Sequence, residues 1–159
     1  MELYCDYIAT PRGIFTVLFN DSGIYRILFP GSAPEERSRE RRLPFTKLPE
    51  DFNRYLAGEV VDWSNYLLDR SGYAPFTGKV LEKVSEIPYG TVSTYREVAK
   101  KAGSPVAWRA AGQALGANRH PIMVPCHRVI KSDMSLGGFS GPAGWKRELL
   151  FLEGAFRLI

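Results

Sequence analysis

The hydrophobic pattern near the N-terminus is typical of short strands joined by tight turns. Residues 2–9 alternate loosely between apolar and polar positions, and residues 14–19 and 24–29 are rich in β-branched and aromatic side chains. Turn-forming sequences separate them at residues 10–13 (TPRG) and 20–23 (NDSG). We therefore predict three strands, the last two of which form a hairpin.

The rest of the N-terminal part carries weaker signals. Residues 35–42 have mixed charges, which predicts a solvated helix or a mobile loop. Residues 49–57 begin with a proline and are followed by Gly58, a pattern that predicts a short helix. Residues 60–63 are compatible with one more short strand. This part of the chain thus predicts a small sheet with one or two helices, and it indicates no chemistry.

A helical periodicity begins after residues 68–75, which read as a junction between two units. Residues 75–87 place four apolar side chains on one face at helical spacing. These are Val80, Leu81, Val84 and Ile87. Thr94 and Glu97 form a capping-box pattern, which predicts the start of another helix that ends near Ala102.

One more helix is predicted directly after it. Gly103 provides a stop, and Ser104-Pro105 provides a cap and a start for a helix that reaches Leu115. Two short helices joined by such a turn are typical of a helix-turn-helix. We therefore expect an α+β protein with an N-terminal α+β structural domain at residues 1–70 and a helical domain at residues 71–159.

Composition limits the function classes without choosing among them. The 159 residues are 45% hydrophobic and 24% charged, an ordinary globular mixture. No apolar run approaches the roughly 18 residues of a membrane-spanning helix, and the acidic N-terminus lacks a signal-peptide pattern. We expect no membrane association and a cytoplasmic location.

The net charge is distributed unevenly. Residues 1–70 hold nine Lys and Arg against eleven Asp and Glu, whereas residues 71–159 hold twelve against six. The helical unit therefore carries a net charge of +6, which favours phosphate binding but encodes no sequence preference.

The cysteines and histidines are few. Cys5 and Cys126 do not suggest a disulfide framework, and with His120 and His127 they show no spacing typical of a zinc site. We expect no metal. Cys5 is interpreted as a packed residue because no basic neighbour would activate its thiol, and His120 is interpreted as a loop residue.

The strongest indication of chemistry is the segment 125–129 (PCHRV). It places Cys126, a strong nucleophile in its thiolate form, next to His127, a candidate base. This segment resembles the acceptor site of the O6-alkylguanine-DNA alkyltransferases, and the resemblance extends from about Pro75 to Gly154. The matching segments are Ile87-Pro88-Tyr89-Gly90, Ser93-Thr94-Tyr95, Arg109-Ala110, Asn118, the segment 125–129, Gly138-Phe139-Ser140-Gly141 and Leu152-Glu153-Gly154.

The resemblance implies a fold and an activity. It implies a ribonuclease H-like N-terminal unit of sheet and helix, followed by a winged-helix-like C-terminal unit. It also implies a monomer that binds double-stranded DNA through the minor groove and flips the damaged nucleotide out of the helix. Such a protein transfers an alkyl group irreversibly from O6-alkylguanine, and from O4-alkylthymine, to Cys126. No cofactor is needed because the alkyl group is already attached to a leaving group.

The resemblance also implies catalytic roles for five residues. Cys126 is the acceptor, and His127 is the base that acts on it through a bridging water, since neighbours in an extended strand point to opposite faces. Glu153 orients His127. Asn118 is the hinge between the recognition helix and the acceptor segment, and Tyr95 contacts the flipped guanine.

DNA and substrate contacts follow from the same resemblance. Arg109 is expected to enter the space that the flipped nucleotide leaves, with Tyr95, Thr94, Ala110 and Ser104 as further DNA contacts. Small side chains on this helix allow a close approach to DNA, although they also allow close helix packing. The expected substrate pocket contains Pro125, Val129, Gly138, Phe139, Ser140 and Lys146. Phe139 departs from a common family pattern with tyrosine, so stabilisation of the leaving group is expected from Tyr95 and the backbone N–H of Ser140.

Two other function classes remain as alternatives. An alkyltransferase-like protein recognises lesions without transfer, but such proteins lack the acceptor cysteine that this chain has. A helix-turn-helix regulator with a sensing thiol is the other, although no dimerisation element is evident in the sequence.

Overall fold

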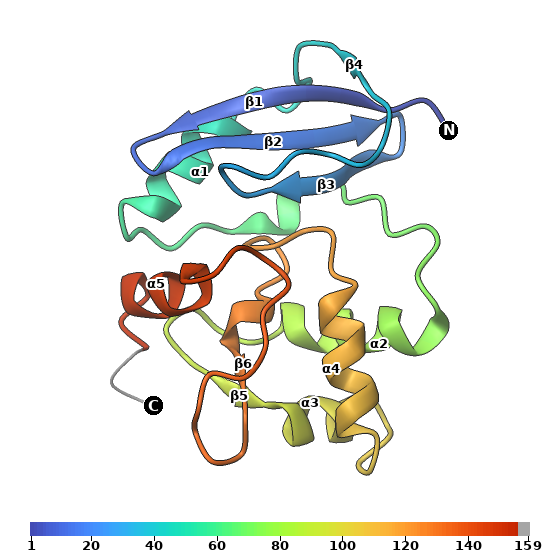
Figure 1. Cartoon of the computed structure of the whole chain (residues 1–159), viewed down its shortest axis with the longest axis vertical. Helices are drawn as coiled ribbons and strands as arrows, with labels where there is room; N and C mark the ends of the chain where they lie inside the picture. The colour runs from blue at the N-terminus through green and yellow to red at the C-terminus, as the bar shows by residue number, and fades with distance from the viewer. Residues whose placement is uncertain (156–159) are drawn as a thin grey trace. The chain divides into compact units, whose positions relative to one another are not determined.

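The computed structural model describes residues 1–155, and its contacts separate two compact units, Met1–Arg70 and Ser71–Ile159. Figure 1 shows strands concentrated in the first unit and helices in the second. Within the described residues, no helix is long and apolar enough to cross a membrane.

The first unit contains a four-stranded sheet in the order β3-β2-β1-β4. Strands β1 (Tyr4–Thr10), β2 (Gly13–Asn20) and β3 (Gly23–Leu28) form an antiparallel meander, which confirms the three predicted strands and the hairpin. The prediction for residues 35–42 was wrong in part, because β4 (Arg39–Glu40) pairs in parallel with β1. The free edge of β1 supplies the hydrogen-bonding groups that order this segment.

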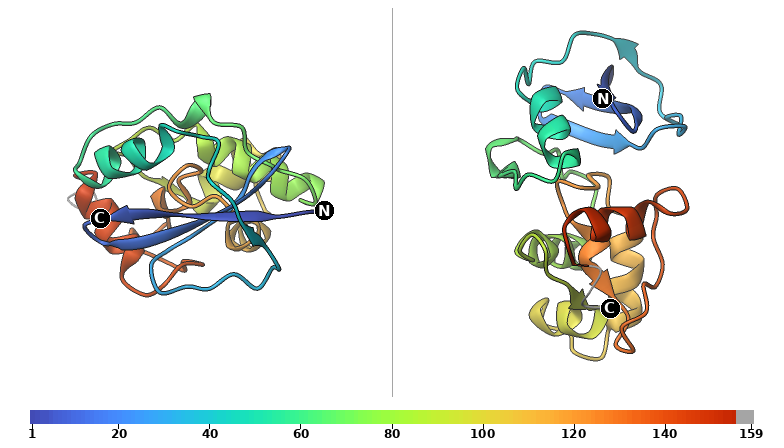
Figure 2. Two further views of the ribbon diagram at one scale, coloured as in Figure 1. Left: turned by 90° about the horizontal axis from the view of Figure 1, so that it is seen from above. Right: turned by 90° about the vertical axis from the view of Figure 1, so that its left-hand side faces the viewer.

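Helix α1 (Leu48–Leu56) lies against one face of this sheet, as Figure 2 shows. The ring of Phe52 lies 5.3 Å from the ring of Phe15, and both side chains are fully buried. The predicted helix is therefore confirmed. The strand expected at residues 60–63 is absent, since a 3₁₀ turn, η1 (Trp63–Asn65), begins where the Asp62 side chain accepts a hydrogen bond from the Ser64 N–H at 2.9 Å.

The second unit is built on three helices that contact one another, α2 (Pro75–Ser85), α3 (Tyr95–Lys101) and α4 (Trp108–Gly116). Their shared core is made of small and branched side chains. These are Val80, Leu81, Val84, Val98, Ala99, Ala111, Ala114 and Leu115. The capping box of α3 is present, with Thr94 Oγ1 accepting from the Glu97 N–H.

Helix α4 begins later than predicted. Residues 104–107 form a turn in which the Ala107 N–H donates to the Ser104 carbonyl at 2.9 Å, so Ser104 is not the N-cap. Proline is favoured at the second position of such a turn, which explains why Pro105 does not start the helix here. The helix-turn-helix itself is present, with a longer connection between its helices.

The remaining elements join these helices to the C-terminal part. Strands β5 (Ser93–Thr94) and β6 (Val129–Ile130) pair in parallel, with Ser93 opposite Val129. The 3₁₀ turn η2 (Cys126–Arg128) lies directly before β6, and helix α5 (Trp145–Leu152) follows a long loop. The pairing brings the start of α3 next to the segment that carries Cys126.

Candidate active site

The segment between α4 and Cys126 is held by the side chain of Asn118. Its Nδ2 donates to the Val124 carbonyl at 3.0 Å, and its Oδ1 accepts from the His120 N–H at 3.0 Å. His120 was expected on a loop, and it is on one, but its side chain is buried. Asn118 therefore ties the end of α4 to the acceptor segment from both sides.

Pro125 turns the chain sharply before Cys126. Its φ of −80° and ψ of 63° are those of an inverse γ-turn, and the Cys126 N–H donates to the Val124 carbonyl at 2.8 Å. Proline suits this turn because its ring fixes φ near the required value. The chain then continues as a 3₁₀ turn, so the expectation that Cys126 and His127 lie in an extended strand was wrong.

The side chains of Cys126 and His127 nevertheless lie in different surroundings. Cys126 lines a cavity, whereas the His127 side chain is fully buried. His127 Nε2 lies 2.8 Å from Glu153 Oε1, and the Glu153 side chain is also fully buried. The expected pairing of this histidine with Glu153 is thus present in the structure.

Arg128 completes the surroundings of Glu153. Its Nε lies 2.9 Å from Glu153 Oε2 and its Nη2 lies 2.8 Å from Oε1, while its Nη1 donates to the Ile87 carbonyl at 2.6 Å. A buried carboxylate needs such compensation, since charge is costly away from water. Arg128 therefore binds the carboxylate of Glu153 and the backbone just before Pro88, and it does not line the cavity.

Burial sets the protonation states of the acceptor and its neighbour. It raises the pKa of the Cys126 thiol, although hydrogen bonding from Asn118 and the charge of Lys146 oppose it. Burial lowers the pKa of His127 below its usual value, against the opposing effect of Glu153. The histidine is therefore neutral near pH 7 and able to accept a proton, which the thiol needs a base to release.

The carboxylate remains ionised. Burial alone would raise the pKa of Glu153, but hydrogen bonds from His127 and Arg128 outweigh it and lower the pKa to about 2. An ionised Glu153 accepts a hydrogen bond from the Nε2 of His127, which leaves Nδ1 as the atom that can take a proton. The pairing of His127 with Glu153 is therefore the one expected of a base and the group that orients it.

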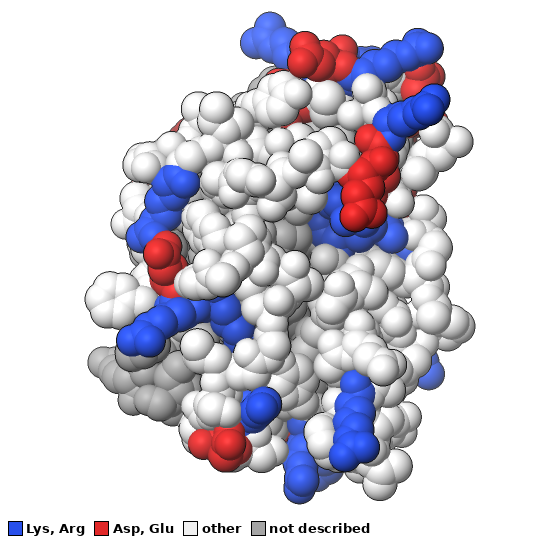
Figure 3. All heavy atoms as spheres, in the orientation of Figure 1, with Lys and Arg blue, Asp and Glu red and all other residues white. Residues whose placement is uncertain are grey.

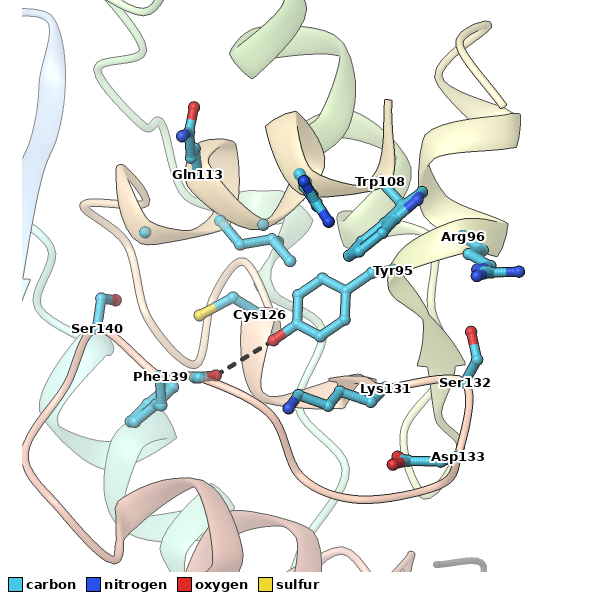
Figure 4. A pocket seen from close by; sticks show the side chains of 15 residues that line it. Tyr95, Arg96, Trp108, Gln113, Cys126, Lys131, Ser132, Asp133, Phe139 and Ser140 are labelled. Atoms are coloured by element: carbon cyan, nitrogen blue, oxygen red, sulfur yellow. Dashed lines mark hydrogen bonds between the residues drawn. The ribbon is translucent and has the colours of Figure 1, made fainter. Parts of the chain in front are cut away.

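A cavity of about 800 Å³ opens in front of Cys126. Its walls come from the start of α3, one side of α4 and the loop after β6, as the close view in Figure 4 shows. Its volume is within the range of small-molecule sites, and a nucleobase fits easily.

Two side chains hold the loop after β6 in place. Lys146 Nζ donates to the carbonyls of Val129 and Gly138 at 2.6 and 3.0 Å, and Tyr95 Oη donates to the Gly138 carbonyl at 3.3 Å, the dashed line in Figure 4. Burial lowers the pKa of Lys146 to about 8. Gly137 is required beside Tyr95, because its φ is +74° and an added Cβ would lie 2.9 Å from Tyr95 Oη.

The structure brings most of the predicted site residues together, but not all of them to the cavity. Cys126, Tyr95, Arg109, Gly138, Phe139 and Ser140 line it. Pro125, Val129, Lys146, Asn118, His127 and Glu153 are buried behind its wall. Thr94, Ser104 and Ala110 lie outside it, at the cap of α3, in the turn before α4 and on the exposed side of α4.

Sequence reasoning missed several residues of the cavity wall. Arg96, Trp108 and Lys131 line it, and none was assigned a site role. A signal was available for two of them, since Arg96 follows Tyr95 and Trp108 precedes Arg109 on the helices already identified. Lys131 belongs to the loop after β6, whose path no local pattern predicts.

Basic side chains dominate the exposed charge of the second unit. In the lower part of Figure 3 separate blue patches are visible with little red between them. Arg96, Arg109 and Lys131 bring positive charge to the mouth of the cavity itself. Among residues 1–155, no group of three or more His, Cys, Asp or Glu side chains could hold a metal ion.

Comparisons with known proteins agree with this site. The family model described as 6-O-methylguanine DNA methyltransferase, DNA binding domain, matches residues 75–155. The methylated-DNA–protein-cysteine methyltransferase of Haemophilus influenzae is 39% identical over 155 residues, which cover 95% of this chain and 86% of that protein. A DNA base-flipping protein of Thermus thermophilus is 36% identical over 149 residues, 94% of this chain and 99% of that protein.

A solved structure extends the similarity to the whole fold. The crystal structure of Mycobacterium tuberculosis OGT in complex with DNA has a TM-score of 0.86 and 32% sequence identity, and it covers 96% of this chain and 94% of its own. The matched domain, the full-length relatives and the buried His-Glu pair beside a cysteine lead to one conclusion. The chain belongs to the 6-O-methylguanine DNA methyltransferase family.

Proposed function

We propose that the protein repairs alkylated DNA by direct reversal, with Cys126 as the acceptor in a single irreversible turnover. Its substrates are O6-alkylguanine and O4-alkylthymine in double-stranded DNA. The observation that carries the proposal is the position of Cys126 on the wall of a cavity large enough for a nucleobase, next in the chain to His127, which is buried and paired with Glu153 at 2.8 Å.

The acceptor is activated by its buried neighbour. A water between Cys126 and His127 relays the thiol proton to Nδ1 of His127, and the ionised Glu153 stabilises the resulting cation. The thiolate then attacks the alkyl carbon. A carbon–sulfur bond forms as the carbon–oxygen bond breaks, and the electron pair of that bond moves to the guanine, which takes up one proton. The thioether product is stable, so each chain acts once.

Stabilisation of the leaving guanine falls on the groups around the cavity. Tyr95 carries a hydroxyl at the cavity, and burial together with the nearby Cys126 raises its pKa, so it stays protonated. In this proposal its one O–H turns from the Gly138 carbonyl to the guanine. Phe139 can pack against the base but cannot donate a hydrogen bond. The backbone N–H of Ser140 is the second donor in this proposal.

The helix-turn-helix binds the DNA through helix α4. The exposed part of this helix carries Ala110 and Gly116, small residues that permit a close approach in a minor groove about 6 Å wide. Arg109 enters the space left by the flipped nucleotide. Thr94, the N-cap of α3, and Ser104, in the turn before α4, are proposed as contacts to the DNA backbone that set the position of the helix.

The two units have separate roles in this proposal. Residues 1–70 form a structural domain whose strand order, β3-β2-β1-β4, supports a ribonuclease H-like arrangement. Residues 71–159 form a winged-helix-like domain that binds DNA and holds the acceptor. The protein acts as a monomer, because one chain supplies every proposed site residue, and it acts in the cytoplasm on the chromosome.

One alternative has a specific observation in its favour. The Thermus thermophilus relative that spans almost the same length is named a DNA base-flipping protein, which suggests lesion recognition without transfer. The cysteine at position 126 and its paired histidine support transfer instead, since recognition alone needs neither.

The two functions are separated by cysteine variants. We expect Cys126→Ser to lose transfer of a radiolabelled methyl group from duplex DNA while it keeps its affinity for that DNA. Cys5→Ser is the matched control, because Cys5 is the other buried cysteine and lies in β1 of the first unit. Transfer that survives in Cys126→Ser, or that is lost in Cys5→Ser alone, would contradict the assignment of the acceptor.

A further inference from the structure

Trp108 lies in contact with two arginines at the mouth of the cavity. The guanidinium carbon of Arg109 lies 4.9 Å from the centroid of the indole ring, and that of Arg96 lies 5.8 Å from it. All three residues line the cavity that contains Cys126, and Figure 4 shows Trp108 and Arg96 at the edge of this cavity away from Cys126. The mechanism above uses only Arg109.

This arrangement is not a consequence of core packing. Trp108 is 38% exposed, and both arginines are exposed. The indole stands at the first position of α4 and outside the core, although more than half of its surface is covered. The two guanidinium groups contribute to that cover, and they place the ring in contact with both arginines at the cavity.

The contacts have a clear electrostatic consequence. The face of an indole ring attracts cations, and a distance of about 6 Å or less from the centroid is effective. Arg96 on α3 and Arg109 on α4 carry like charges that repel each other, and the ring between the two helices offsets part of this repulsion. The contact with the indole thus favours rotamers that keep the guanidinium group of Arg109 at the cavity, whereas an arginine without such a contact samples many rotamers.

We propose that Trp108 is a positioning residue for Arg109 in the repair of duplex DNA. Its indole holds the guanidinium group of Arg109 where the arginine enters the base stack, so that less conformational entropy is lost when the nucleotide is flipped. This inference rests on the proposed function, since it requires Arg109 to occupy the vacated space. It predicts that Trp108 affects duplex repair through Arg109 and not through the chemistry at Cys126.

A double-mutant cycle tests the inference. The variants are Trp108→Leu, which keeps apolar bulk without an aromatic face, Trp108→Phe, which keeps an aromatic face, Arg109→Ala, and the double variant of Trp108→Leu with Arg109→Ala. Phe151→Leu, at an exposed aromatic position on α5, is the matched control. The single-turnover rate is measured for each variant with duplex DNA containing O6-methylguanine and with free O6-benzylguanine.

We expect Trp108→Leu to slow duplex repair by about twofold to fivefold, with a much smaller effect on the free base, and Trp108→Phe to recover most of the rate. The double variant should be no slower than Arg109→Ala, and Phe151→Leu should match the unmodified protein. Effects that multiply in the double variant would overturn the inference in favour of a direct contact between Trp108 and DNA. Equal slowing with duplex and free base would indicate a structural role.

The result for Arg109→Ala alone separates this inference from the proposed function. If Arg109→Ala repairs duplex DNA at the normal rate, the positioning role of Trp108 is overturned together with the role of the arginine. Transfer of the alkyl group to Cys126 in the unmodified protein would still stand in that case.

Discussion

The carboxylate of Glu153 lies 2.8 Å from Nε2 of His127, and both side chains are fully buried. Glu153 directly follows α5, and His127 lies in the 3₁₀ turn η2. The pair therefore joins two segments that are 26 residues apart in the chain. The same carboxylate binds Arg128. The pair therefore fixes both the ring of the proposed base and the packing of α5 on the acceptor segment.

This pair makes stability depend on pH. The pKa of Glu153 is about 2 in the folded protein against an ordinary value of 4.5, so the unfolded chain binds more protons between these values. The stabilisation from ionised Glu153, about 3 kcal/mol, is present above pH 4.5 and is lost as the pH falls towards 2.

Glu153→Gln is the variant that isolates this effect. At pH 7 it should reduce the free energy of unfolding by about 3–5 kcal/mol, because Arg128 loses its buried partner. The difference from the unmodified protein should shrink below pH 4.5, as measured by urea denaturation at a series of pH values. A difference that stays constant down to pH 3 would show that folding does not lower the pKa of Glu153.

His127→Gln should separate proton transfer from packing. Glutamine can still hydrogen-bond to Glu153 but cannot accept the thiol proton, so we expect the rate with free O6-benzylguanine at pH 7 to fall by about 10²–10³. Because burial raises the pKa of Cys126, the rate of the variant should rise steadily above pH 7 as hydroxide replaces the base. The unmodified protein should change little over the same range, and parallel pH profiles would rule out His127 as the base.

Phe139→Tyr should place a hydroxyl at the cavity wall and accelerate transfer. We expect the transfer rate to increase by about threefold to tenfold. This is less than the effect of a single donor in a typical oxyanion hole, because the backbone N–H of Ser140 is already present. Ser140→Ala keeps that N–H and should leave the rate close to normal. An unchanged rate in Phe139→Tyr would mean that the backbone donor is sufficient.

Gly137 and Gly144 offer a matched test of the contact between the loop and Tyr95. Both have positive φ, +74° and +90°, so alanine should strain either backbone by about 1 kcal/mol. Only at Gly137 would the added Cβ meet Tyr95 Oη, at 2.9 Å, while nothing lies within 4 Å at Gly144. Gly137→Ala should therefore slow transfer well beyond Gly144→Ala, at similar loss of thermal stability. Equal transfer rates in the two variants would show that the position of Tyr95 does not affect the reaction.

The sequence predicted the elements whose signals are local. The hairpin turn, the helix that follows Lys47 and the capping box at Thr94 are decided by neighbouring residues, and the structure has all three. The start of α4 was misjudged because Ser104-Pro105 satisfies the rules for a helix start and for a turn equally well. Local sequence rules do not distinguish the helix start from the turn. The packing of α4 on α2 and α3 decides where the helix begins.

The acceptor segment shows where local rules end. Residues 120–130 are all buried, and Ile122 has a φ of 73°, a rare conformation for a β-branched residue. Neither property follows from hydrophobic periodicity, since hydrogen bonds from Asn118 and the core around Glu153 impose them. The candidate site residues could be predicted from motifs that resemble those of a known family, whereas the burial of His127 and the 3₁₀ turn at Cys126 required the structure.

In the proposed function, Cys126 accepts the alkyl group once and keeps it. Intact-protein mass spectrometry after mixing with an excess of duplex DNA containing O6-methylguanine tests it most directly. We expect the addition of one methyl group per chain, located on Cys126 by peptide digestion. An unchanged mass, with tight binding to the same DNA, would contradict it and identify the protein as one that recognises lesions without repairing them.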